Sequence, residues 1–137
     1  MNAYVLDACA LLAFLLDEDG AEVVEKKLEE AAQGECIIWI HAVNILEIYY
    51  GVMRDCGSSK ADAILERINA LPTLIIRELS EVTVRTAGRL KATNRLSLAD
   101  SIAVGEAINR QATLVTADHH ELDEIERREN LKFLWIR

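Results

Sequence analysis

The sequence has few of the residues that interrupt regular structure. It contains one proline, Pro72, and six glycines in 137 residues, which favours regular elements, helices above all, and excludes collagen-like and loop-rich folds. Aromatic residues make up only 5% of the chain. The three cysteines, Cys9, Cys36 and Cys56, are odd in number and lack C-x-x-C spacing. Neither a disulfide framework nor a zinc knuckle is therefore implied.

A secretion signal and a long hydrophobic run are also missing. The run ACALLAFLL (8–16) has the length of a signal-peptide core, but no Lys or Arg precedes it and Asp7 stands directly before it. His41, Asn44 and Glu47 interrupt the best candidate for a membrane span. We therefore expect a cytoplasmic protein with no membrane segment.

Positive charge is scarce, with 15 Lys and Arg against 23 Asp and Glu and a net charge of −8. This balance excludes a protein that coats nucleic acid through bulk electrostatics. It does not exclude a nucleic-acid enzyme, because a metal-binding carboxylate cluster is itself a concentrated negative charge. At 51% hydrophobic residues the chain is too apolar for disorder. Its length predicts a single domain over residues 1–137.

Short apolar runs alternate along the chain with longer segments of helical periodicity. Strands are predicted at 3–7, 36–40, 73–77, 112–116 and 131–136. Helices are predicted at 8–18, 20–33, 42–55, 59–71, 80–94, 98–111 and 119–129. This alternation predicts an α/β fold of three layers, in which helices flank a central parallel sheet of about five strands.

Four acidic residues occupy the positions where a parallel α/β fold binds ligands. Asp7 closes the first strand, Asp118 follows the fourth, Asp100 lies in the first turn of the helix over 98–111, and Glu47 lies in the helix after the second strand. All four are expected at the same edge of the sheet. Oxygen ligands alone suit Mg²⁺ or Mn²⁺, which can activate water for phosphodiester hydrolysis.

Each acid also has a purely structural interpretation. Asp7 is a possible N-cap, and the segments 97–100 and 118–121 both have the pattern of a capping box. Glu47 is possibly one solvated charge on a buried helix. Asp7 and Asp100 stand out because apolar neighbours surround them, where an unpartnered carboxylate is unfavourable. The joint pattern of four acids is harder to explain by capping than any one of them.

The segments around these acids resemble the motifs of the PIN domain family: VLDACALLAFLLDE, AVNILEIYYG, LSLADSIAVGEAI and LVTAD. The resemblance extends from Tyr4 to about Asp118, and the compact form is similar to the VapC-type toxins of type II toxin–antitoxin systems. It implies a PIN-like fold and a Mg²⁺- or Mn²⁺-dependent endoribonuclease. It also implies a cognate antitoxin that wraps the protein and inserts an Arg or Lys into the site.

The resemblance assigns roles to six residues. The metal ligands and catalytic acids that it implies are Asp7, Glu47, Asp100 and Asp118, and the supporting residues are Thr116 and Asn44. The chain departs from the family pattern at Ala8 and Cys9, where a Ser or Thr is frequent, and at His41, where a Ser is common. Neither departure removes a metal ligand.

Two further groups of side chains have two interpretations each. A basic group either holds RNA phosphates or forms a solvated helix face; it consists of Arg85, Arg89, Lys91 and Arg95. A second group forms either the face of a homodimer or part of the core; it consists of Tyr49, Tyr50 and Met53.

Three classes of function remain after these observations. The first is a PIN-type ribonuclease, either a toxin or a stand-alone RNA-processing nuclease. The second is a receiver-like phosphoacceptor domain, which would need an acidic pair after the first strand and a late Lys; Asp7 stands alone and LVTADHHEL has no Lys. The third is a catalytically silent binding domain of the same fold. Dinucleotide-binding and Walker motifs are absent, and Cys9 breaks a D-x-D phosphatase motif.

Overall fold

A computed structural model that describes residues 1–137 contains seven helices and five strands. The strands are β1 (Asn2–Leu6), β2 (Cys36–His41), β3 (Leu74–Ile76), β4 (Thr113–Thr116) and β5 (Phe133–Trp135). The helices are α1 (Ala8–Leu15), α2 (Ala21–Ala32), α3 (Ala42–Cys56), α4 (Ser58–Asn69), α5 (Glu81–Thr93), α6 (Leu98–Asn109) and α7 (His119–Arg128). Every predicted element is present, and the bounds differ by a few residues. The first helix ends at Leu15 rather than residue 18, because the chain turns at Asp17, whose φ is 53°.

The five strands form one sheet in the order β3-β2-β1-β4-β5, and all four pairings are parallel. Leu6, at the end of the central strand β1, lies opposite Ile40 of β2 and Val115 of β4. The chain builds the sheet from β1 toward β3 and then returns to the other side of β1 for β4. The order therefore reverses between β1 and β4, which is where such sheets place a ligand.

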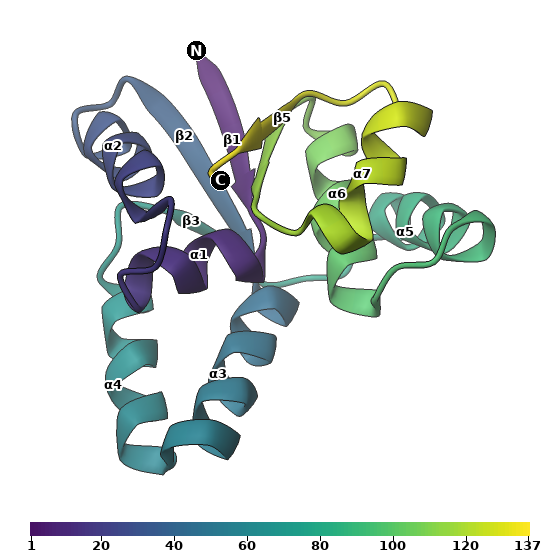
Figure 1. Cartoon of the computed structure of the whole chain (residues 1–137). Coiled ribbons are helices and arrows are strands. Elements are labelled where there is room, and N and C mark those ends of the chain that lie inside the picture. The colour runs from purple at the N-terminus through teal and green to yellow at the C-terminus, as the bar shows by residue number, and fades with distance from the viewer.

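The sheet separates two hydrophobic clusters, because alternate residues of a strand face opposite sides. Tyr4 and Leu6 of β1 face a cluster formed with α1 to α4, whereas Val5 faces a cluster formed with α5, α6 and α7. Figure 1 shows α1 and α2 on one side of the sheet and α5 to α7 on the other, with α3 and α4 packed together beyond the ends of the strands. This arrangement confirms the predicted three-layer α/β/α fold.

The helices that begin at the carboxyl edge of the sheet have side-chain caps. Asp7 caps α1, Ser97 caps α6 and Asp118 caps α7. His41, where the family pattern often has Ser, caps α3 by accepting a hydrogen bond from the backbone N–H of Val43 at 3.0 Å. These caps fix the starts of α3 and α6, which carry Glu47 and Asp100, while Asp7 and Asp118 are themselves cap residues. None of the helices has the combination of length and apolar character needed to cross a bilayer.

Candidate metal centre at the carboxyl edge of the sheet

Asp7 is held rigidly at the end of β1. Only 1% of it is exposed, and its Oδ1 accepts the backbone N–H of Ala10 at 2.8 Å. Its Oδ2 accepts the hydroxyl of Thr116. The capping interpretation of Asp7 is therefore realised in the structure. It is compatible with ligand binding, because each carboxylate oxygen has a second lone pair.

The surroundings of Asp7 make its negative charge unfavourable. Burial raises the pKa of Asp7 to about 7, and the charges of Asp100 and Asp118 add to this rise, while the hydrogen bonds from Thr116 and Ala10 oppose it. A cation beside the carboxylate would favour the ionised form. The site therefore has the electrostatics of a cation-binding pocket.

Asp100 lies in the first turn of α6, and its backbone N–H donates to Oγ of Ser97 at 3.1 Å. It is 8% exposed. Burial raises the pKa of Asp100 to about 7, with a further increase from Asp118, Glu47 and Glu121. Two acids from distant parts of the chain, Asp7 and Asp100, thus share one buried and electronegative environment.

Glu47 projects from α3 toward the same environment. Its Oε2 is buried and has no hydrogen-bond partner. Burial raises the pKa of Glu47, and the charges of Asp118 and Glu121 raise it further. One helical turn earlier, Asn44 is fully buried with both polar side-chain atoms unpartnered. Buried polar atoms without partners are rare in folded proteins and indicate a ligand or an ordered water.

Thr116, the last residue of β4, links Asp7 to Asp118. Its hydroxyl donates to Asp7, and its Oγ1 accepts the backbone N–H of Asp118 at 3.0 Å. Asp118 in turn caps α7, because its Oδ1 accepts the N–H of Glu121 at 3.1 Å. The carboxylate of Glu121 raises the pKa of Glu47 as well. Glu121, which the sequence offered only as part of a capping box, therefore adds negative charge near the predicted acids, although it does not line their groove.

A groove of about 460 Å³ opens between α1 and α3 and ends at the acids. Glu47, Asp100 and Asp118 line it, together with Cys9 of α1. Burial raises the pKa of the Cys9 thiol to about 11, and the neighbouring Asp7 contributes to this increase. The thiol therefore stays protonated at neutral pH and is a poor nucleophile.

The donor atoms of this edge fit Mg²⁺ or Mn²⁺, although the side chains are not gathered into a complete coordination sphere. No group of three or more His, Cys, Asp or Glu side chains has the geometry to hold an ion. The four predicted acids supply hard oxygen donors, and Oε2 of Glu47 is buried without a partner. Oxygen donors and partial burial suit these ions rather than zinc.

Three of the four basic residues predicted to contact RNA are engaged with groups of the protein itself. Arg85 pairs with Glu81 and Arg89 makes two hydrogen bonds to Glu129. Lys91 donates to the carbonyl of Leu96. Arg95 lines a pocket that also contains His120 and Glu121, which places it near α7. Contact with RNA remains a prediction for all four.

Of the three residues predicted for a dimer face or the core, one is half-buried and two are exposed. Tyr49 is half-buried, and its hydroxyl donates to Asp62 of α4 at 2.6 Å. Tyr50 and Met53 are exposed and do not belong to the core. The homodimer remains a prediction.

The fold and the acidic groove define a three-layer α/β protein with a carboxylate site at the point where the strand order reverses. The model of the PIN domain family matches residues 4–128. The chain therefore belongs to the PIN domain family, as its motifs predicted. Among curated proteins, no sequence matches this chain.

Solved structures of similar fold come from several bacterial toxin–antitoxin pairs. A chain of VapBC2 from Rickettsia felis, bound to a promoter DNA fragment, is 22% identical over 96% of this chain and 97% of that chain, with a TM-score of 0.74. A chain of DNA-bound VapBC from Salmonella typhimurium is 15% identical over 100% of both chains, with a TM-score of 0.75. VapC20 from Mycobacterium tuberculosis, a Sarcin-Ricin loop cleaving toxin, is 12% identical over 88% of this chain and 94% of that chain, with a TM-score of 0.67. At these identities the likeness shows a common fold.

Proposed function

We propose that this protein is a Mg²⁺- or Mn²⁺-dependent endoribonuclease of the cytoplasm and the toxin of a type II toxin–antitoxin pair. The observation that carries the proposal is the convergence of Asp7, Glu47, Asp100 and Asp118 on one edge of the sheet, where burial and mutual repulsion raise the pKa of three of them. Membership of the PIN domain family supports it. The likeness in fold to VapC20, named as a cleaving toxin, adds further support.

The side chains have distinct roles in this proposal. Asp7 and Asp100 would hold the metal ion, with Asp118 and Glu47 completing its surroundings, and Thr116 would fix the positions of Asp7 and Asp118. When bound, Mg²⁺ or Mn²⁺ supplies Lewis acidity toward a phosphodiester. The four acids would otherwise repel the phosphate, so the reaction depends on the ion.

The nucleophile in this proposal is water. Oε2 of Glu47 has no hydrogen-bond partner and is available to accept a proton from the attacking water. Attack of the water oxygen on phosphorus breaks the bond to the 3′ oxygen, which takes up a proton. The products carry a 5′-phosphate and a 3′-hydroxyl. A covalent intermediate on Cys9 is disfavoured, because its thiol stays protonated.

Cleavage of a labelled loop RNA tests the activity. Wild-type protein with Mn²⁺ should cleave it, whereas excess EDTA or the substitution Asp100→Asn should abolish cleavage. Isothermal titration with Mn²⁺ should show weaker binding for Asp7→Asn and Asp100→Asn. Cyclic-phosphate ends on the products, or undiminished cleavage in EDTA, would exclude this mechanism.

Co-expression with the neighbouring reading frame tests the toxin assignment. We expect that the chain alone slows growth of its host, and that the neighbouring product binds it in a pull-down and restores growth. The groove between α1 and α3 ends at acids and suits a partner segment that brings an Arg or Lys. A chain that is harmless and has no such partner would be a stand-alone PIN-domain nuclease instead.

A further inference from the structure

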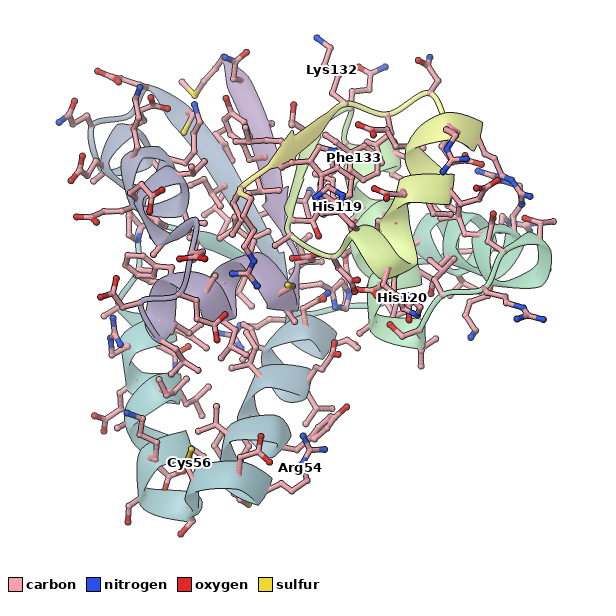
Figure 2. All side chains as sticks on the ribbon, viewed as in Figure 1. Arg54, Cys56, His119, His120, Lys132 and Phe133 are labelled. Carbon is pink, nitrogen blue, oxygen red and sulfur yellow. The ribbon has the colours of Figure 1, made fainter.

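Three aromatic side chains form a continuous stack between β5 and the start of α7. Phe133 and Trp135 lie two residues apart on the edge strand β5, so they share a face. Their ring centroids are 5.3 Å apart with planes 16° from parallel. The ring of His119 continues the stack on Trp135, with centroids 3.9 Å apart and planes 11° from parallel. Figure 2 shows His119 and Phe133 close together beneath β5.

The ring of His119 has a fixed orientation. Its Nδ1 lies 2.8 Å from Oδ1 of Asp123, and its Nε2 lies 2.9 Å from the backbone carbonyl oxygen of Arg137. The side chain is nevertheless 49% exposed. One face of the ring lies on Trp135 and both nitrogens are engaged, and no aromatic ring stacks on the opposite face. We refer to this opposite face as the open face.

The residue that carries this open face adjoins the candidate metal centre in the chain. His119 is the first residue of α7 and directly follows Asp118. At the other end of the stack, Phe133 and Trp135 pack against the hydrophobic cluster that includes Leu122. The stack is therefore anchored in the core at one end and terminates at the other in the residue that directly follows Asp118.

We propose that the open face of His119 stacks a base of the RNA substrate close to the bond that is cleaved, with Trp135 and Phe133 as a rigid support. The inference rests on the proposed ribonuclease function. Base stacking on an aromatic side chain contributes roughly 5- to 150-fold to affinity for each base, and it tolerates any base. Stacking is also suited to this chain, because a net charge of −8 offers the RNA backbone little attraction.

The proposal specifies the substrate as an unpaired nucleotide, since the bases of a duplex already stack on each other. Steady-state cleavage of a loop RNA in Mn²⁺ should compare His119→Phe with His119→Leu. Both substitutions remove the contacts to Asp123 and the carbonyl of Arg137, and only phenylalanine keeps an aromatic face. We expect His119→Leu to raise KM roughly 5- to 150-fold with little change in kcat, and His119→Phe to stay within about threefold of the wild type.

His120 provides a matched control, because it is the neighbouring exposed histidine on α7 and has no aromatic partner. The substitution His120→Ala should leave KM unchanged. Equal KM values for His119→Phe and His119→Leu would overturn the proposal. Thermal melts measure the structural cost of each change, which should be larger for leucine because phenylalanine keeps the stack on Trp135. A purely structural role of the ring predicts no coupling to any one base of the substrate, which substrates with an abasic position measure.

Substrates with a single abasic position locate the stacked base. In the wild type, one abasic position near the cleaved bond should raise KM, and the same abasic position should have no effect in His119→Leu. If the wild type cleaves RNA but no abasic position is coupled to His119 in this way, the stacking proposal is wrong and the ribonuclease function stands. If the wild type cleaves no RNA in Mn²⁺, the ribonuclease function itself fails, and the stacking proposal fails with it.

Discussion

Replacing Asp100 by asparagine should stabilise the metal-free protein, although it should damage the metal site. Asp100 is 8% exposed, and burial raises its pKa from 3.8 to about 7, with Asp118 as the next contribution. At pH 8 the folded protein therefore contains a buried carboxylate whose charge is unfavourable. Asparagine has nearly the same shape and no charge, so it removes this repulsion.

The size of the effect follows from the two pKa values. The unfolded chain releases this proton near pH 3.8 and the folded chain near pH 7, so the penalty grows as the pH rises between these values and is complete above pH 7. The full difference corresponds to roughly 4 kcal/mol. Solvent screening at a partly accessible edge reduces it to about 1–3 kcal/mol. For a domain of this size, Tm should rise by roughly 3–12 °C.

Thermal melts in EDTA at pH 8 and pH 4.5 measure this effect. Asp100→Asn should melt above the wild type at pH 8, and the gap should narrow at pH 4.5. Adding Mn²⁺ at pH 8 should raise the Tm of the wild type and not that of the variant. Asp55→Asn is the control, because Asp55 is exposed at the far end of α3 and its substitution should change Tm little. A lower Tm for Asp100→Asn at pH 8 without metal would refute the reasoning and assign Asp100 to the fold.

Three further substitutions test the surroundings of the site. Thr116→Val removes the hydroxyl bond to Asp7, and it should lower stability by about 1–3 kcal/mol and weaken Mn²⁺ binding in a titration. Asn44→Leu replaces two buried unpartnered atoms, so thermal melts should show a higher Tm while cleavage falls; a lower Tm would show that the fold requires the amide. Gly20→Ala should destabilise by about 2 kcal/mol or more, because φ is +94° and the new Cβ would lie 2.6 Å from the carbonyl oxygen of Ile136; an unchanged melt would contradict this geometry.

Local sequence patterns predict most of the secondary structure and the fold class. Apolar runs bounded by turn residues predicted the five strands, and helical periodicity predicted the seven helices, because both depend on short-range spacing. The expected convergence of Asp7 and Asp100 followed from a general property of parallel sheets, whose strands end at a common edge. Their apolar neighbours predicted burial, and the structure places both in the interior.

Local patterns did not predict which partner a side chain bonds to when several are possible. The basic residues at 85–95 are close in sequence, but Arg89 bonds to Glu129, forty positions away. Asp7 is both the N-cap of α1 and a candidate metal ligand, whereas local sequence patterns presented these two roles as alternatives. Such choices depend on distances between elements, which spacing along the chain does not contain.

The sequence by itself determined the secondary structure, the parallel α/β class, the family and the four acids that close strands or begin helices. Only the tertiary structure decided the strand order β3-β2-β1-β4-β5, the link from Thr116 to Asp7, the effect of the Glu121 charge on Glu47 and the aromatic stack that ends at His119. Local spacing sets which residues share a helix turn or a strand face. Contacts such as that between His119 and Trp135 arise only when packing of the hydrophobic clusters brings separate elements together, and the physical properties of the site depend on those contacts.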